Sequence, residues 1–296
     1  MNAIDKLIKA IERKGNPTAL GLDTDASYLP ESVIERNWTR GEACKHILAY
    51  NVALIDRLKS IVPCVKVQAA YYEQYGAEGM ITFSTTLAYA STVGLVTIAD
   101  VKRNDIGSTA AAYAKAYLRP DAPFAADFIT VNGYLGADGV QPFVDACKVH
   151  GKGIFVLVKT SNPGSAEFQD RVLDNGNKLY EEVAARLEQW GKPLVGTHGY
   201  SAAGAVVGAT YPEQGAALRK AYPGLFFLVP GYGAPGGGAK DIVGCFDGAG
   251  SGAVVNNSRG LLCAYKQEKY KGMTAVAAAY AAAVEMREDI AKALVK

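Results

Sequence analysis

Short apolar runs recur along the chain and alternate with segments of helical periodicity. Eight runs have the length of a β-strand, and they cover residues 18–22, 63–68, 94–98, 128–131, 153–158, 193–196, 225–229 and 252–255. Between and after them, apolar positions at helical spacing predict helices near 42–61, 70–91, 108–118, 136–150, 177–190 and 273–294. Because no hairpin turns recur, the alternation predicts parallel strands joined by helical crossovers.

This pattern predicts a (β/α)₈ barrel, formed as a single domain by residues 1–296. The amphipathic segment 1–15 predicts a helix before the first strand, and residues 24–41, which lack a clean period, predict an insertion after it. A doubly wound open sheet is the competing fold. Its dinucleotide fingerprint GxGxxG would follow the first strand, but that strand ends in LDTDAS.

Composition narrows the kind of ligand and the compartment. The chain has 31 Lys and Arg against 29 Asp and Glu, a formal charge of +2. The chain has no long run of like charges, so neither nucleic acid nor a membrane surface is expected as a partner. The expected ligand is a small molecule. The five cysteines lack metal-ligand spacing and predict reduced, mostly buried thiols. No signal-peptide core and no apolar run of about 18 residues is present, so a cytoplasmic protein is expected.

The segment 97–109, TIADVKRNDIGST, carries the densest charge of any predicted strand end. If the strand continues to Lys102, then Asp100 and Lys102 share one face, because side chains alternate along a strand. Asp105 follows three residues later, and an alanine-rich helix begins just beyond Ile106. An acid, a base and a second acid therefore lie across one strand-to-helix turn.

Polar residues also close most of the other predicted strands, where the chemistry of a barrel is found. They are Asp23, Lys66, Gln68, Asn132, residues 159–162 and Arg259. Lys66 lies between two valines and needs a counter-charge if it points into the barrel mouth; Asp100 is the expected partner. Together with Asp105 this makes two lysines and two aspartates, which form either a catalytic site or a salt-bridge network that only stabilises the mouth.

A glycine-rich loop and an arginine predict a phosphate site. The loop 231–238, GYGAPGGG, follows the seventh predicted strand, and Arg259 follows the eighth. Loops after these two strands commonly bind phosphate in such barrels. Glycines let backbone N–H groups converge on an anion, and arginine binds phosphate oxygens bidentately.

With these motifs, the sequence resembles the orotidine 5'-phosphate decarboxylase family over most of its length. The marker DxKxxDI is matched by Asp100, Lys102, Asp105 and Ile106, although related phosphosugar lyases share DxKxxD. Further matches in the same order are GLD at Asp23, VKV at Lys66, SxPG at 161–164, PGxGA at 230–234 and SRG at Arg259. The insertion after Asp23 and the TSNPGS form resemble the longer bacterial subgroup.

The resemblance implies decarboxylation of orotidine 5'-monophosphate (OMP) to uridine 5'-monophosphate (UMP) and CO₂, the last step of de novo UMP synthesis. It implies no metal, no cofactor, and a homodimer with shared active sites. Lys102 would deliver a proton to C6 of the pyrimidine, and Asp100 would face the substrate carboxylate. The chemistry of the residues agrees, since losing CO₂ from an sp² carbon leaves a carbanion that needs a fixed cation and a proton donor.

The resemblance also implies binding roles. Asp105, Ile106 and Thr109 would reach the site of the partner subunit. The remaining contacts would be Asp23 and Lys66 to the ribose hydroxyls, Ser161 to the pyrimidine, and Arg259 with the amide of Gly236 to the phosphate. One departure is Pro235, which stands where the family has a glutamine and offers neither a side-chain amide nor an N–H. Arg259 and glycine amides are therefore expected to carry more of the phosphate binding.

Two other functions are alternatives to OMP decarboxylation. A phosphosugar decarboxylase or aldol lyase of the same superfamily would use a divalent metal to stabilise an enediolate. A barrel that only binds a nucleotide as a sensor would not need the arrangement of Asp100, Lys102 and Asp105.

Overall fold

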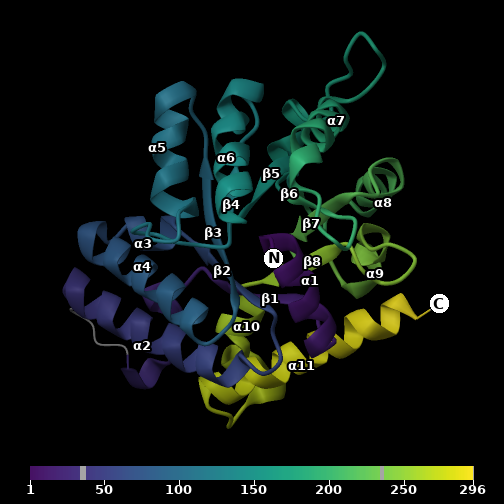
Figure 1. Cartoon of the computed structure of the whole chain (residues 1–296). Coiled ribbons are helices and arrows are strands. Elements are labelled where there is room, and N and C mark those ends of the chain that lie inside the picture. Colours follow the sequence, from purple (N-terminus) through teal and green to yellow (C-terminus); the bar gives the residue numbers. More distant parts are fainter. Residues whose placement is uncertain (34–37, 234–236, 296) are drawn as a thin grey trace.

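The computed structural model describes residues 1–33, 38–233 and 237–295. Eight parallel strands pair in sequence order and close into a barrel, with β8 beside β1 (Figure 1). The (β/α)₈ prediction is confirmed. The strands are β1 (Thr18–Leu22), β2 (Cys64–Gln68), β3 (Val96–Arg103), β4 (Phe128–Val131), β5 (Gly153–Lys159), β6 (Ser201–Val207), β7 (Leu225–Val229) and β8 (Ala253–Asn257).

Helices cover the outside of the barrel. Figure 1 shows α5 and α6 side by side on one flank, while α11 packs against α10 and α2. The α-helices are α1 (Ala3–Lys14), α2 (Arg40–Leu58), α3 (Ala70–Glu73), α4 (Gly76–Thr92), α5 (Gly107–Leu118), α6 (Ala137–His150), α7 (Leu179–Gly191), α8 (Pro212–Ala221), α9 (Ala239–Ile242), α10 (Arg259–Leu262) and α11 (Ala275–Leu294). The described part of the insertion after β1 holds two short 3₁₀ turns, Ala26–Tyr28 and Glu31–Val33.

Seven of the eight strands lie where the sequence predicts them, but the sixth prediction is wrong. The predicted run 193–196 overlaps a 3₁₀ turn, Lys192–Leu194, and β6 lies further on. Every residue of β6, SAAGAVV, is buried, yet most of its side chains are too small to give a strong apolar pattern. The small residues leave room for neighbours: a Cβ on Gly204 would lie 2.7 Å from the Phe155 ring and 2.5 Å from the Phe226 carbonyl oxygen.

The cysteines are free thiols, as predicted, with four of the five buried. Cys263 is partly exposed. In the part of the chain that the structure describes, no helix is long and apolar enough to cross a membrane.

Helix α1 lies across the amino-terminal opening of the barrel, because it contacts both β3 and β6. Asp5 of α1 is buried there and accepts hydrogen bonds from the Thr197 N–H (3.1 Å) and from His198 Nδ1 (2.8 Å). Burial alone would raise the pKa of Asp5, but these hydrogen bonds outweigh it and lower the pKa to about 2. The carboxylate therefore fixes α1 to the segment that enters β6.

Replacing this carboxylate gives a pH-dependent stability prediction. The folded pKa of Asp5 lies below its ordinary value of 3.8, so the stabilisation is complete above about pH 4 and is lost as pH falls toward 2. We expect Asp5→Asn to lower the free energy of unfolding by about 2 kcal/mol at pH 7 and by much less near pH 2.5. Denaturant titrations at both pH values measure this, with the exposed Asp174→Asn as control. A loss of equal size at both pH values would contradict it.

Candidate active site

A cavity of about 960 Å³ opens at the carboxyl ends of the strands. This volume suits a small-molecule ligand. Each strand, or the residue just after it, contributes to the lining, through Asp23, Lys66, Asp100, Thr130, Leu157, Val206, Leu228 and Asn256. The charged strand ends singled out in the sequence therefore meet in one place.

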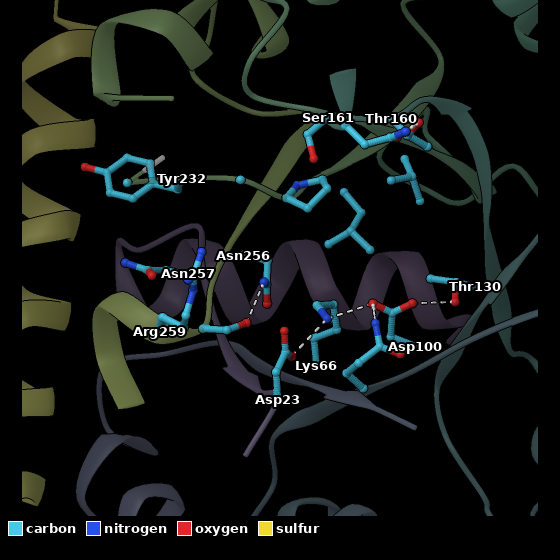
Figure 2. A pocket seen from close by; sticks show the side chains of 18 of the residues that line it. Asp23, Lys66, Asp100, Thr130, Thr160, Ser161, Tyr232, Asn256, Asn257 and Arg259 are labelled. Atoms are coloured by element: carbon cyan, nitrogen blue, oxygen red, sulfur yellow. Dashed lines mark hydrogen bonds and ion pairs between the residues drawn. The ribbon is translucent and has the colours of Figure 1, made fainter. Parts of the chain in front are cut away.

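Alternating charges run across one wall of this cavity (Figure 2). The Lys66 ammonium donates to Asp100 Oδ2 at 2.7 Å and lies 3.4 Å from Asp23 Oδ1. The Lys102 ammonium donates to the other Asp100 oxygen, Oδ1, at 2.6 Å. Asp100 is thus held between two ammonium groups, and the expected pairing of Lys66 with Asp100 is confirmed.

Burial and charge act against each other in this group. Burial would raise the pKa of Asp100, but the Lys66 and Lys102 ammoniums outweigh it and hold that pKa well below its usual range. Burial would likewise lower the pKa of Lys66, and the Asp100 and Asp23 carboxylates instead raise it. Asp100 and Lys66 therefore both stay charged at neutral pH, as an ion pair inside the barrel mouth.

The backbone at Lys102 is strained. Its φ is 45°. Among the described residues, no other residue except glycine has a positive φ. Pairing between β3 and β4 shifts register between Ala99 and Arg103, as at a β-bulge. Strain of this kind is tolerated where surrounding contacts enforce it, and it is common at active sites. Here it places the half-exposed Lys102 ammonium beside Asp100 and at the edge of the cavity.

Thr130 on β4 supports this bulge, a role that the sequence pattern around it does not predict. Its hydroxyl oxygen accepts from the N–H groups of Val101 and Lys102, at 2.9 and 2.8 Å, and donates to Asp100 Oδ1 at 2.8 Å. The threonine thus replaces the ladder hydrogen bonds that the bulge interrupts. A threonine in an apolar strand is ordinary, and only the β3–β4 register brings it next to Asp100.

Arg259 lies on the opposite side of the cavity from Asp100, with Asp23 and Lys66 between them (Figure 2). It is the first residue of α10 and lines the cavity. Within residues 1–33, 38–233 and 237–295, its guanidinium has no hydrogen-bond partner. Ser161 also lines the cavity, on a third side. Gly236, which was expected to bind the phosphate, and Pro235 beside it lie outside the described residues.

Three predicted site residues do not line the cavity of their own chain: Asp105, Ile106 and Thr109. Asp105 Oδ1 accepts from the Ile106 N–H at 2.8 Å, and residue Ile106 is 53% exposed. Within one chain, Asp23 rather than Asp105 completes the set of two lysines and two aspartates. No group of three or more His, Cys, Asp or Glu suited to hold a metal ion occurs among the described residues.

A closed parallel barrel whose acids, lysines and arginine meet at the carboxyl ends of its strands defines a (β/α)₈-barrel enzyme. The family is shown by comparison with known proteins. The chain belongs to the orotidine 5'-phosphate decarboxylase / HUMPS family, whose model matches residues 21–271.

Individual relatives are similar in sequence to this chain over nearly its whole length. An orotidine 5'-phosphate decarboxylase of Rhodopirellula baltica is 45% identical, over 91% of this chain and 91% of its own. One from Clostridium acetobutylicum is 41% identical, over 98% of this chain and 99% of its own. Among solved structures, a putative orotidine 5'-phosphate decarboxylase from Streptomyces avermitilis superimposes with a TM-score of 0.84 at 31% identity, covering 100% of this chain and 96% of that one.

Proposed function

We propose that this chain catalyses the decarboxylation of OMP to UMP and CO₂, as the last step of pyrimidine nucleotide synthesis in the cytoplasm. The observation that carries the proposal is the contiguous set Asp23, Lys66, Asp100 and Lys102 at the cavity wall. The relatives named above carry the same activity in their names. The predicted single domain over 1–296 stays a prediction, supported by a cavity that draws on all eight strands.

The substrate is proposed to bind across the cavity. Its phosphate would contact Arg259, whose guanidinium suits bidentate binding of phosphate oxygens. Its pyrimidine would lie between Ser161 and the ion pairs, with the ribose hydroxyls near Asp23 and Lys66. Arg259 lies on the opposite side of the cavity from the ion pairs of Lys66 and Lys102 with Asp100, which supports an elongated ligand whose phosphate is at one end and whose reacting carbon is at the other (Figure 2).

In the reaction, Lys102 is proposed to protonate C6 as the bond to CO₂ breaks. The electron pair left on C6 would develop next to the Lys102 ammonium, which is already oriented by Asp100 and needs little reorganisation. Asp100 would lie near the substrate carboxylate; at ~4 Å and an effective dielectric of about 20, the repulsion is about 4 kcal/mol. Stabilisation of the transition state by Lys102 is the contribution we propose to dominate.

We also propose a homodimer with shared sites, to which Asp105, Ile106 and Thr109 contribute across the interface. The exposure of Ile106 and the position of these three residues outside their own cavity support it. Ile106 precedes α5, and the large apolar side chains of Tyr134 and Leu135 just before α6 are exposed as well. An apolar surface of this kind is common at subunit interfaces.

The metal-dependent alternative is not favoured, because the relatives identified above are named as orotidine 5'-phosphate decarboxylases. We expect the purified protein to convert OMP to UMP and to keep its full rate after exhaustive chelation and dialysis. The loss of OMP absorbance, with UMP quantified by chromatography, measures this. Activity that disappears on chelation and returns with a divalent metal would support the alternative. If no UMP forms at any protein concentration, a nucleotide-binding sensor is favoured instead.

A further inference from the structure

A second lysine is buried next to the cavity but does not line it. Lys159, the last residue of β5, has a fully buried side chain. Its ammonium donates to both carboxylate oxygens of Asp170 at 3.0 Å and to Ser165 Oγ at 3.2 Å. It also lies 4.3 Å from the centre of the Tyr211 ring, at a distance suited to a cation–π contact. A buried ammonium is costly, so these partners hold it in one place.

The partners of Lys159 lie in a segment that forms one wall of the cavity. Residues 160–170 follow β5, and most of them line the cavity, including Ser161 and Phe168. The segment holds one 3₁₀ turn, Pro163–Glu167, and no strand or α-helix. Because regular hydrogen bonding is sparse here, the wall depends on side-chain contacts for its shape. Lys159 joins its beginning to Ser165 and Asp170 further along.

Further contacts fix the start of the same segment. The Gln169 side chain accepts from the Thr160 N–H at 2.9 Å and donates to the Thr160 hydroxyl at 2.7 Å. On the β6 side, a Cβ on Gly208 would lie 2.7 Å from the Ser161 nitrogen, so only glycine permits the close approach. Asp170 directly follows Gln169. Releasing Asp170 from Lys159 would therefore loosen Gln169, Thr160 and then Ser161.

We propose that Lys159 is a positioning residue for recognition of the base: through Asp170 and Ser165 it holds the wall that presents Ser161 to the pyrimidine. This inference rests on the proposed function. Arg259, on another side of the cavity, has no contact with this network among the described residues. Loss of Lys159 should thus weaken binding of the base while leaving binding of the ribose phosphate unchanged.

Inhibition of OMP decarboxylation by UMP and by ribose 5-phosphate tests the positioning role of Lys159. UMP carries both base and ribose phosphate, whereas ribose 5-phosphate lacks the base. In Lys159→Met, which keeps most of the side-chain length, we expect the inhibition constant for UMP to rise about tenfold, the effect of losing about one good polar contact. That for ribose 5-phosphate should stay within about twofold of wild type. Unchanged UMP inhibition, or equal weakening of both ligands, would overturn the proposal.

The double variant Lys159→Met/Asp170→Asn separates positioning from mere stability. It removes both charges of the pair, so no unpaired buried ammonium and no unpaired carboxylate remain to destabilise the protein, yet it cannot restore the ion pair between them. We expect it to fold and to lose affinity for UMP alone, whereas full recovery of UMP affinity would overturn the proposal. Lys178→Met, at the other end of the β5–α7 connection, is the matched control and should match wild type. Wild-type protein that does not decarboxylate OMP would instead count against the proposed function.

Discussion

Lys102→Ala is expected to lower kcat for OMP decarboxylation by at least about 10²-fold, as loss of a preorganised electrostatic group typically does. The cation and proton donor proposed for C6 are both removed by this change. The fold should survive, because the Lys102 side chain is 45% exposed. Asp100 also keeps its bonds from Lys66, Gln68 and Thr130.

Steady-state kinetics and UMP binding check this expectation together. UMP should bind Lys102→Ala within a few-fold of wild type, since UMP has no departing carboxylate and needs no proton at C6. Lys9→Ala, an exposed lysine of α1 far from the strand carboxyl ends, is the control and should keep wild-type turnover. Near-wild-type kcat in Lys102→Ala would refute the proposed role of this lysine.

Mixed dimers of Asp105→Ala and Lys102→Ala chains are expected to recover activity that neither variant has alone. If Asp105 serves the partner's site, one site of each mixed dimer has both defects and the other has neither. Random exchange makes half of the dimers mixed, so about a quarter of wild-type activity should return. Each parent should be at least about 10²-fold impaired. Co-expression with two different affinity tags isolates the mixed dimers for assay.

A second pair is the control for this experiment. Lys102 and Arg259 both line the cavity of their own chain, so a mixed dimer of Lys102→Ala and Arg259→Ala has one defect in each site. That pair should stay inactive. Mixed dimers of the first pair that assemble but remain inactive would disprove the shared site.

Local sequence was enough for most strands and for the central ion pairs. Period-two alternation places Asp100 and Lys102 on one face, and the structure pairs them at 2.6 Å. Lys66 between two valines required a counter-charge, and Asp100 supplies it. The sixth strand was not predicted, because its residues are small and its hydrophobic pattern is weak. They are small because of packing against other strands: the Phe155 ring fills the space beside Gly204. Hydrophobicity along one strand carries no record of that packing.

The sequence by itself determined the parallel barrel, the charged strand ends and the family, because these follow from periodicity and from motifs a few residues long. Only the tertiary structure decided which distant groups meet. The pairing of β1 with β2 in the closed barrel brings Asp23 to Lys66. The register of β4 against the bulged β3 brings Thr130 to Asp100. In the sequence, Lys159 was one of several polar residues at predicted strand ends, and nothing there predicted its burial. Contacts between residues far apart in sequence depend on register and strand order, which no single stretch of sequence encodes.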